Sequence, residues 1–207
     1  MTDIGPPSYR EATRERLLTS ATAILEAEGL EAVQARRVAR EAGCSVGTLY
    51  NVFGDIDGLI IAMNARSLAR LGQVVSAAEA ADPSRPLADR LLALAKGYVG
   101  FAVANRSRWE AIFKHRLPDG REVPASYLAD QARLMALIEE ALAGTVSDPE
   151  RRAFAARGLF AAVHGAVTLA LDDRLGGQLH RELEAQIRFI TGTMAAAIES
   201  GRDVWHA

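Results

Sequence analysis

Cysteine is almost absent from this chain, which has a single one, Cys44, among 207 residues. One cysteine cannot form an internal disulfide, and it supplies no thiolate cluster for zinc or an iron-sulfur centre. The four histidines, His115, His164, His180 and His206, are scattered without the spacing of metal ligands. We therefore expect no metal site, no cofactor and no chemistry based on cysteine.

The chain also lacks a long uninterrupted apolar run and a recognisable leader. Its longest apolar stretch, residues 158–171, is interrupted by His164 and Thr168 and is shorter than the ~20 residues that cross a bilayer. Residues 1–7 do not show the basic segment followed by an apolar one that is typical of a secretory signal. We therefore expect a buried core helix at 158–171 and a cytoplasmic protein with no membrane partner.

Sequence patterns of known enzyme classes are missing as well. The chain has no GxGxxG, no P-loop, no HExxH and no Ser/His/Asp or Cys/His arrangement. The sequence therefore predicts a protein that is not an enzyme.

Positive charge is not in excess either. The formal net charge is −2, and residues 1–58 contain six arginines against nine acidic residues. This balance argues against a basic surface that coats nucleic acid. A few donors and a helix N-terminus can still hold phosphates, and Arg36, Arg37 and Arg40 lie together in the sequence.

Helical periodicity is abundant. Hydrophobic residues make up 49% of the chain, enough for a substantial core. Leu17, Ala21, Ile24 and Leu25 recur at helical spacing, and Gly29 follows as a C-terminal cap. We predict an all-α fold of about nine helices. Their approximate ranges are 10–28, 35–42, 46–53, 55–80, 87–106, 109–115, 124–143, 149 to the Gly176-Gly177 break, and 180–199.

The two short helices near residues 35–42 and 46–53 form a helix-turn-helix outline. Gly43 in the turn can adopt the left-handed conformation that other residues resist. Ser45 is placed to cap the second helix, whose free N–H groups and dipole would then attract a phosphate. The apolar side of this helix would be fixed by Val46, Leu49 and Phe53, and its outward side would be Ser45, Gly47, Thr48, Tyr50 and Asn51.

The last two predicted helices carry apolar residues on more than one face. In the final helix, one stripe is Leu183, Ile187, Ile190, Met194 and Ile198, and a second is Phe189, Gly192 and Ala196. One stripe can face the core and the other a second copy, which predicts a four-helix bundle across a two-fold axis. The alternative is that both helices are buried within a monomer.

The helix-turn-helix segment resembles the signature of tetracycline-repressor-type (TetR) regulators over about residues 14–60. The residues that carry the resemblance are Val38-Ala39, the run from Ala42 to Tyr50, Phe53 and Leu59. The resemblance implies a helix-turn-helix DNA-binding domain at 1–55 and a ligand-binding and dimerisation domain at 56–207. It implies a repressor that binds double-stranded operator DNA and is released when a small, largely apolar effector binds.

The same resemblance implies which residues contact DNA, in a dimer whose half-sites lie ~34 Å or a multiple apart. Phosphates would be bound by Ser45, Thr48 and Tyr50, and bases would lie near Val46, Gly47 and Asn51, with Gln34 and Arg36 completing the set. Tyr50 could instead be a core aromatic, or its ring could pack while its hydroxyl binds phosphate.

Two positions depart from the family pattern. The family has Ser or Thr where Gln34 stands and a phosphate-binding lysine where Ile56 stands. This implies weaker phosphate binding, or a compensating contact from Tyr9, Arg10 or Arg14.

The resemblance further implies an effector pocket that is apolar with few polar groups. The candidate lining residues are Tyr98, Phe101, Trp109, Phe113, Tyr127 and His164. Trp109 and the His164-Gly165 pair also resemble a branch of the family whose C-terminal domain carries a tryptophan and a His-Gly pair (WHG-type). His164 could instead be a core histidine bonded to a neighbouring helix, Trp109 a packing residue, and Cys44 a buried residue rather than a redox switch.

The expected mechanism is a population shift, in which the effector stabilises a spacing of the two recognition helices that does not fit successive grooves. The helix beginning at Asp55 would transmit the change. One alternative is a dimeric ligand-binding or interaction module that has lost operator binding, which the acidic N-terminal domain and Ile56 favour. Turnover of the pocket ligand without DNA binding would indicate an enzyme instead.

Overall fold

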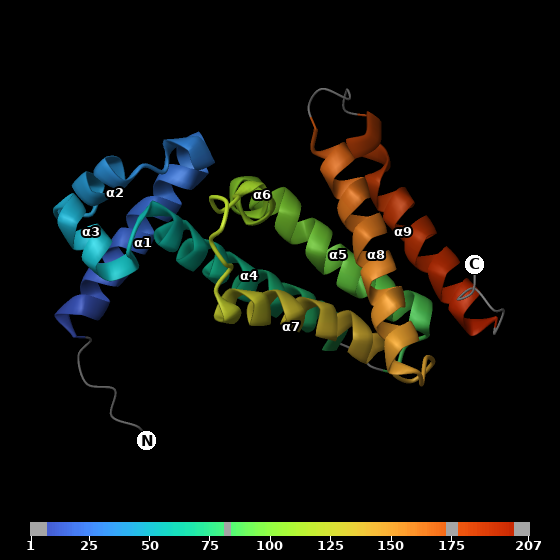
Figure 1. Cartoon of the computed structure of the whole chain (residues 1–207). Coiled ribbons are helices and arrows are strands. Elements are labelled where there is room, and N and C mark those ends of the chain that lie inside the picture. The colour runs from blue at the N-terminus through green and yellow to red at the C-terminus, as the bar shows by residue number, and fades with distance from the viewer. Residues whose placement is uncertain (1–7, 81–83, 173–177, 201–207) are drawn as a thin grey trace, which may run out of the picture. The chain divides into compact units, whose positions relative to one another are not determined.

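The computed structural model describes residues 8–80, 84–172 and 178–200, and within these ranges every regular element is a helix (Figure 1). This confirms the predicted all-α fold. The described elements are α1 (Tyr9–Glu28), η1 (Leu30–Ala32), α2 (Ala35–Glu41), α3 (Val46–Phe53), α4 (Ile56–Ala80), α5 (Leu87–Ala104), α6 (Arg106–Lys114), α7 (Ala125–Leu142), α8 (Pro149–Ala170) and α9 (Gln178–Glu199).

Helix boundaries follow from capping side chains that the sequence supplies. Ser8 and Glu11 form a reciprocal capping box at the start of α1. Asp148 accepts hydrogen bonds from the N–H groups of Glu150 and Arg151, with proline at the first position of α8, as predicted. The break predicted at Gly176-Gly177 lies outside the described residues.

The chain divides into two compact units. The first contains the described residues up to Ser67 together with Asn105–Tyr127, and the second contains Leu68–Ala104 and the described residues from Leu128 onward. Helices α4 and α7 therefore contribute residues to both units. The domain boundary predicted between residues 55 and 56 stays a prediction.

The first unit is built on a core shared by α1, α2, α3, the start of α4 and α6. Its members include Leu17, Leu18, Val38, Leu49 and Leu59, each of which is fully buried. Burial of side chains of this size contributes about 1.5–3 kcal/mol each. This core fixes the orientation of the two short helices α2 and α3.

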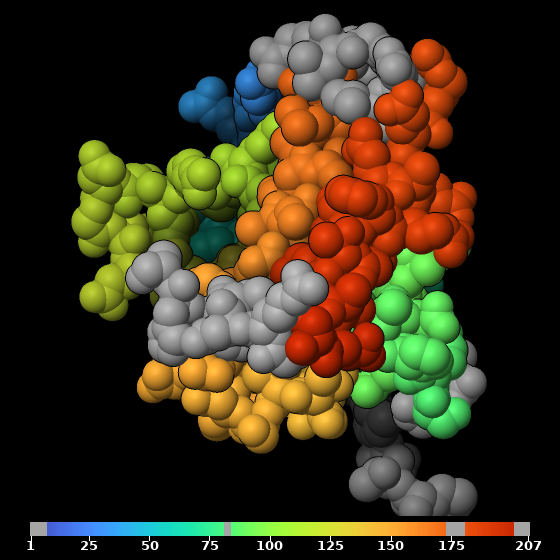
Figure 2. All heavy atoms as spheres, turned by 90° about the vertical axis from the view of Figure 1, so that its right-hand side faces the viewer, coloured from blue at the N-terminus to red at the C-terminus, as the bar shows by residue number. Residues whose placement is uncertain are grey.

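The second unit contains α5, α8 and α9, which pack against one another. Helices α8 and α9 lie side by side (Figure 2). Buried residues recur every three or four positions along α8, at Ala155, Ala156, Leu159, Val163 and Val167. The length and composition of α8 would also suit a membrane span, but this buried stripe is typical of a helix packed on a protein core.

Candidate functional site

The turn between α2 and α3 has the geometry that the sequence predicts. Gly43 adopts φ +67°, the left-handed region that favours glycine. The Ser45 side chain accepts a hydrogen bond from the Thr48 N–H at 3.1 Å, and the two hydroxyls are 2.9 Å apart. Ser45 is therefore the N-cap of α3, as predicted, and the positive end of the α3 dipole is at this capped terminus.

One side of α3 packs on the core of the first unit. Leu49 is fully buried, and Val52 and Phe53 pack against the same core cluster. The prediction that Val46 anchors this side was wrong, because Val46 is half-buried and outside the cluster. It lies one turn before Leu49 at the helix terminus, where the core ends.

The other side of α3 is open to solvent. Tyr50 is 46% exposed, so it is not a core aromatic. Ser45, Gly47 and Asn51 are also exposed, and Thr48 is half-buried. The first unit thus presents a capped helix terminus together with hydroxyl and amide side chains on one short helix.

The three arginines of α2 differ in their ion pairing. Arg37 forms a two-pronged ion pair with Glu28, which raises the pKa of Arg37 and lowers that of Glu28. Arg40 lies 3.3 Å from the carboxylate of Glu41. Arg36 is exposed and forms no ion pair with any residue that the structure describes. The three neighbouring arginines are therefore not equivalent phosphate ligands.

Gln34 is the predicted DNA contact that directly precedes α2. It is exposed and precedes the first residue of α2, where its side chain makes no capping hydrogen bond. Its amide nitrogen donates to the carbonyl of Glu31 at 3.4 Å. Arg14, one of the residues considered as a compensating contact, has its guanidinium 5.3 Å from the centre of the Phe53 ring.

A glycine fixes the connection from α3 to α4. A Cβ atom placed on Gly58 would lie 2.1 Å from the carbonyl oxygen of Phe53, so no other residue fits without a backbone shift. The Gly58 N–H donates to Asp55 Oδ1 at 2.8 Å, so the Asp55 side chain caps the start of α4.

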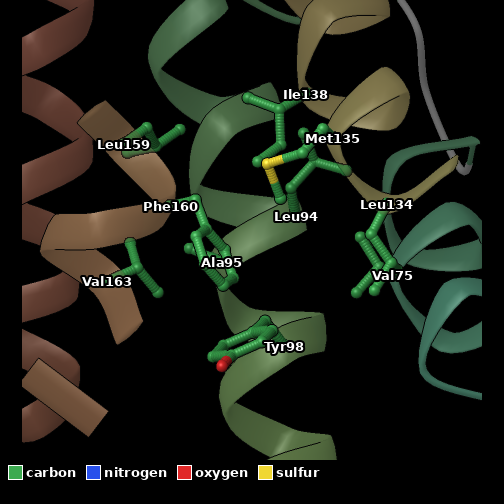
Figure 3. Close-up of a pocket in the computed structure, with 10 residues that line it drawn as sticks. All are labelled: Val75, Leu94, Ala95, Tyr98, Leu134, Met135, Ile138, Leu159, Phe160 and Val163. Atoms are coloured by element: carbon green, nitrogen blue, oxygen red, sulfur yellow. The ribbon is translucent and has the colours of Figure 1, made fainter. Parts of the chain in front are cut away.

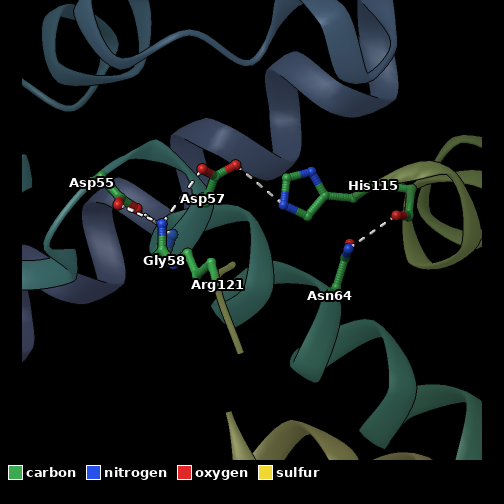
Figure 4. Close-up of polar contacts among 7 residues, drawn as sticks. Asp55, Asp57, Gly58, Asn64, His115 and Arg121 are labelled. Carbon is green, nitrogen blue, oxygen red and sulfur yellow. Dashed lines mark hydrogen bonds and ion pairs between the residues drawn. The ribbon is translucent and has the colours of Figure 1, made fainter. Parts of the chain in front are cut away.

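A polar cluster joins the start of α4 to the segment after α6 (Figure 4). Arg121 binds Asp55 and also lies 3.4 Å from Asp57 Oδ2. His115 Nε2 lies 3.3 Å from Asp57 Oδ1, and Asn64 donates to the carbonyl of Ala111 at 2.9 Å. The sequence gives no local signal for this cluster, because its contacts join residues 47 to 66 positions apart.

Burial within this cluster keeps His115 neutral at pH 7. Arg121 lowers the pKa of Asp55, so this carboxylate is charged at neutral pH. Burial lowers the pKa of His115 from its ordinary value of 6.5, although Asp57 acts in the opposite direction. The contact between His115 and Asp57 is therefore a polar contact to a neutral ring at pH 7.

The second unit contains an apolar cavity between α4, α5, α7 and α8 (Figure 3). Its free volume is about 40 Å³. The close approach of α4 and α5 beside it depends on Gly97, where a Cβ atom would meet Val75 Cα at 3.1 Å. The cavity is lined by Val75, Leu94, Ala95, Tyr98, Leu134, Met135, Ile138, Leu159, Phe160 and Val163.

Tyr98 is the predicted ligand residue that lines this cavity, and His164 contacts Tyr98 without being a lining residue. Tyr98 lies at one end of it, and its hydroxyl is 2.7 Å from His164 Nδ1. The His164 ring also stacks on Phe160, with the ring centres 5.4 Å apart. Burial lowers the pKa of His164, so its imidazole is neutral at pH 7.

The other four predicted ligand residues lie elsewhere. Phe101 is buried on α5 but is not among the residues that line the cavity. Trp109, Phe113 and Tyr127 belong to the first unit, where the Trp109 and Phe113 rings pack with centres 5.5 Å apart. Their assignment as ligand contacts stays a prediction. The aliphatic lining residues were missed because their helical spacing is the same as that of ordinary core residues.

The amino-acid sequence matches two family models. Residues 17–63 match the model described as "Bacterial regulatory proteins, tetR family", and residues 91–194 match that described as "Tetracyclin repressor-like, C-terminal domain". No curated protein matches the chain. The branch predicted from Trp109 and the His164-Gly165 pair stays a prediction.

Solved structures share the fold. A protein of unknown function from Rhodococcus sp. RHA1 is 24% identical, with a TM-score of 0.74 over 95% of this chain and 98% of that one. A tetR-family transcriptional regulator from Streptomyces coelicolor is 19% identical, with a TM-score of 0.67 over 92% and 84%. The fatty acid degradation regulator FadR from Bacillus halodurans is 15% identical, with a TM-score of 0.64 over 86% and 97%.

The two family models together cover more than half of the chain, and they coincide with the helix-turn-helix and with α5, α7 and α8, three of the four helices that line the cavity. Members of this family regulate transcription and are not enzymes. The chain therefore belongs to the tetracycline-repressor family of DNA-binding transcriptional regulators.

Proposed function

We propose that this regulator is a cytoplasmic repressor that binds double-stranded operator DNA as a homodimer and is released by a small, largely apolar effector. The observation that carries the proposal is the solvent-exposed side of α3, where the N-terminus capped by Ser45 lies beside Thr48, Tyr50 and Asn51. Hydroxyl groups and helix N-termini bind phosphates, and an amide can contact a base edge in the major groove.

The proposed DNA contacts are those predicted from the sequence. Ser45, Thr48 and Tyr50 bind phosphates; Val46, Gly47 and Asn51 lie near bases; Gln34 and Arg36 flank them from α2. Arg36 is the cation expected to contact a phosphate, because Arg37 and Arg40 already have acidic partners. The half-exposed position of Val46 supports this assignment, since a core residue could not reach a base.

The homodimer is proposed to form through α8 and α9. Phe189 on α9 is 73% exposed, and Phe154 and Leu169 on α8 are 61% and 51% exposed. Large exposed apolar side chains gathered on neighbouring helices are typical of an interaction surface. A two-fold interface would bury the same residues of both copies.

The effector is proposed to bind in the cavity of the second unit and to shift the population of dimer conformations away from the one that fits DNA. Helix α4 supports this route, because it contributes Val75 to the cavity and Gly58 to the contact with Phe53 of α3. Tyr98 is the predicted ligand residue that lines this cavity, and His164 is proposed to act through its contact with the Tyr98 hydroxyl.

Fluorescence anisotropy with DNA from immediately upstream of the chain's own gene tests the proposal. We expect selective binding whose affinity falls as the salt concentration rises. Tyr50→Ala should lower the affinity for DNA by about tenfold or more, because it removes a phosphate contact. Arg36→Ala should lower the slope of log affinity against log salt by about one, since one phosphate contact is lost.

Arg37→Ala is the matched control on the same helix. It should leave the salt slope unchanged, because Arg37 is paired with Glu28 rather than free to contact phosphate. Equal slopes for Arg36→Ala and the native protein would contradict the assignment of Arg36. No selective binding even at low salt would favour the ligand-binding module that has lost operator binding, which the acidic N-terminal balance and Ile56 would then explain.

A further inference from the structure

A second hollow lies beside the cavity of the second unit. It is a groove between α4 and α7, with a volume of about 370 Å³. Gly72, Gln73 and Ser76 line it from α4, and Asp130, Arg133 and Leu134 line it from α7. The groove therefore has amide, hydroxyl and charged groups in its wall, whereas the polar side chain that lines the cavity is Tyr98.

One residue, Leu134, lines both hollows. A Cβ atom placed on Gly72 would lie 3.6 Å from Leu134 Cδ2, so this leucine lies over the α4 position that has no side chain. The groove and the cavity therefore adjoin at Leu134.

The two hollows differ greatly in volume. The cavity alone, at about 40 Å³, is far below the roughly 300–1,000 Å³ of typical ligand sites. The groove, at about 370 Å³, lies within that range by itself, and the cavity adds a small apolar extension to it. A ligand that fills both must be longer than the cavity and must extend into the groove.

The wall of the cavity does not suit a charge. Nine of its ten lining residues are apolar, and the hydroxyl of the tenth, Tyr98, is already hydrogen-bonded to His164. Arg90 on the same helix as Tyr98 binds Glu79 and the carbonyl of Ala141. A carboxylate or ammonium moved into this cavity would lose its hydration without gaining an opposite charge.

The groove suits a polar end that carries no charge. The Arg133 guanidinium is ion-paired with Asp130, so the two charges in the wall cancel. Ser76 supplies a hydroxyl, and Gln73 supplies an amide that also accepts a hydrogen bond from the exposed Arg70 at 3.4 Å. These groups can hydrogen-bond an alcohol, amide or ester.

We propose that the cavity and the groove form one binding site for an apolar molecule with an uncharged polar end, which enters past Leu134. The apolar part lies among the aliphatic residues of the cavity, and the polar end lies in the groove near Gln73 and Ser76. This inference rests on the proposed function, because it names the chemical class of the effector.

Isothermal titration calorimetry of the full chain without DNA tests the ligand class. The probes are decanol, decanoate and decyltrimethylammonium, which share one alkyl chain and differ in charge. We expect decanol to bind about tenfold or more tightly than either ion, since burial of an unpaired charge is costly. Equal or tighter binding of an ion, or no binding of any probe, would overturn the proposal.

Variants of Leu134 test the entrance. Leu134→Trp should weaken decanol binding by about tenfold because the larger side chain fills the passage. Leu128→Trp on the same helix, at a side chain that is 51% exposed and outside both hollows, is the matched control. Leu134→Ala should speed decanol association in stopped-flow measurements. Unchanged affinity for decanol in Leu134→Trp, or an unchanged association rate in Leu134→Ala, would overturn the proposal that the ligand enters past Leu134.

Asp130→Asn tests the position of the polar end. This variant leaves Arg133 without its ion-pair partner. The affinity for decanoate relative to that for decanol should therefore rise by about two- to fivefold, the range expected for an exposed charge pair. A preference that stays the same would place the polar end outside the groove. These titrations contain no DNA, so their failure is distinct from a failure of operator binding, which the anisotropy assay measures.

Discussion

The exposed phenylalanine on α9 gives a direct test of the proposed dimer through the variant Phe189→Glu. This side chain is 73% exposed in the single chain. Since an aromatic residue buries roughly 150–250 Å², complete burial of the exposed part at about 25 cal/mol/Å² would contribute about 3.5 kcal/mol. In a two-fold interface the substitution occurs twice, so half of this value for each copy would total about 3.5 kcal/mol. At about 1.4 kcal/mol per factor of ten, this loss would raise the dissociation constant of the dimer several hundredfold.

Sedimentation velocity over a range of concentrations measures this change. We expect the native chain to sediment as a dimer and Phe189→Glu as a monomer with unchanged helical circular dichroism. Leu128→Glu, at a residue on α7 that is 51% exposed, should remain a dimer. A Phe189→Glu protein that stays dimeric at the same concentrations would refute the placement of the interface on α9, and a monomeric native chain would refute the dimer itself.

Three further predictions concern stability. Ser45→Ala should lower the free energy of unfolding in urea by about 1 kcal/mol because the N-cap of α3 is lost, and equal stability of this variant would contradict the cap. Ser45→Asp should keep the cap but weaken DNA binding, because its carboxylate repels phosphate. Asn64→Ala should cost about 1 kcal/mol, since the Ala111 carbonyl loses the Asn64 amide but keeps the His115 N–H as a donor. Ser67→Ala, which removes only a bond to a carbonyl within α4, should cost less. Because burial lowers the pKa of His164 below its ordinary 6.5, the unfolded chain binds more protons, so the free energy of unfolding should be constant above about pH 6.5 and fall as the pH drops below it. Urea midpoints at several pH values should show a smaller fall in His164→Gln, and an unchanged fall would assign the effect to other groups such as His115.

Local sequence determined the helices and the turn of the DNA-binding unit. The Ser45 cap, the left-handed Gly43 and the proline after Asp148 act within a few residues, so their effects can be predicted without a fold. The periodicity of apolar residues likewise predicted the all-α class, and the residues from Ala42 to Tyr50 were sufficient to indicate the family.

Tertiary structure decided which predicted residues meet. Arg36, Arg37 and Arg40 are equivalent in the sequence, yet Glu28 pairs with Arg37 because α1 passes beside α2, which leaves Arg36 exposed. Tyr98 and His164, which are 66 residues apart, meet because α5 packs against α8.

The cavity and its groove could not be predicted for the same reason. Leucine, valine and methionine at helical spacing look alike whether they fill a core or line a hollow, because the difference lies in how closely neighbouring helices approach. Gly97 and Gly72 set the approach of α4 to α5 and to Leu134 of α7. The sequence by itself therefore determined the helices, the turn between α2 and α3 with its Ser45 cap, and the family. Only the packing of helices distant in sequence decided where a ligand can bind and which arginine of α2 has no acidic partner among the described residues.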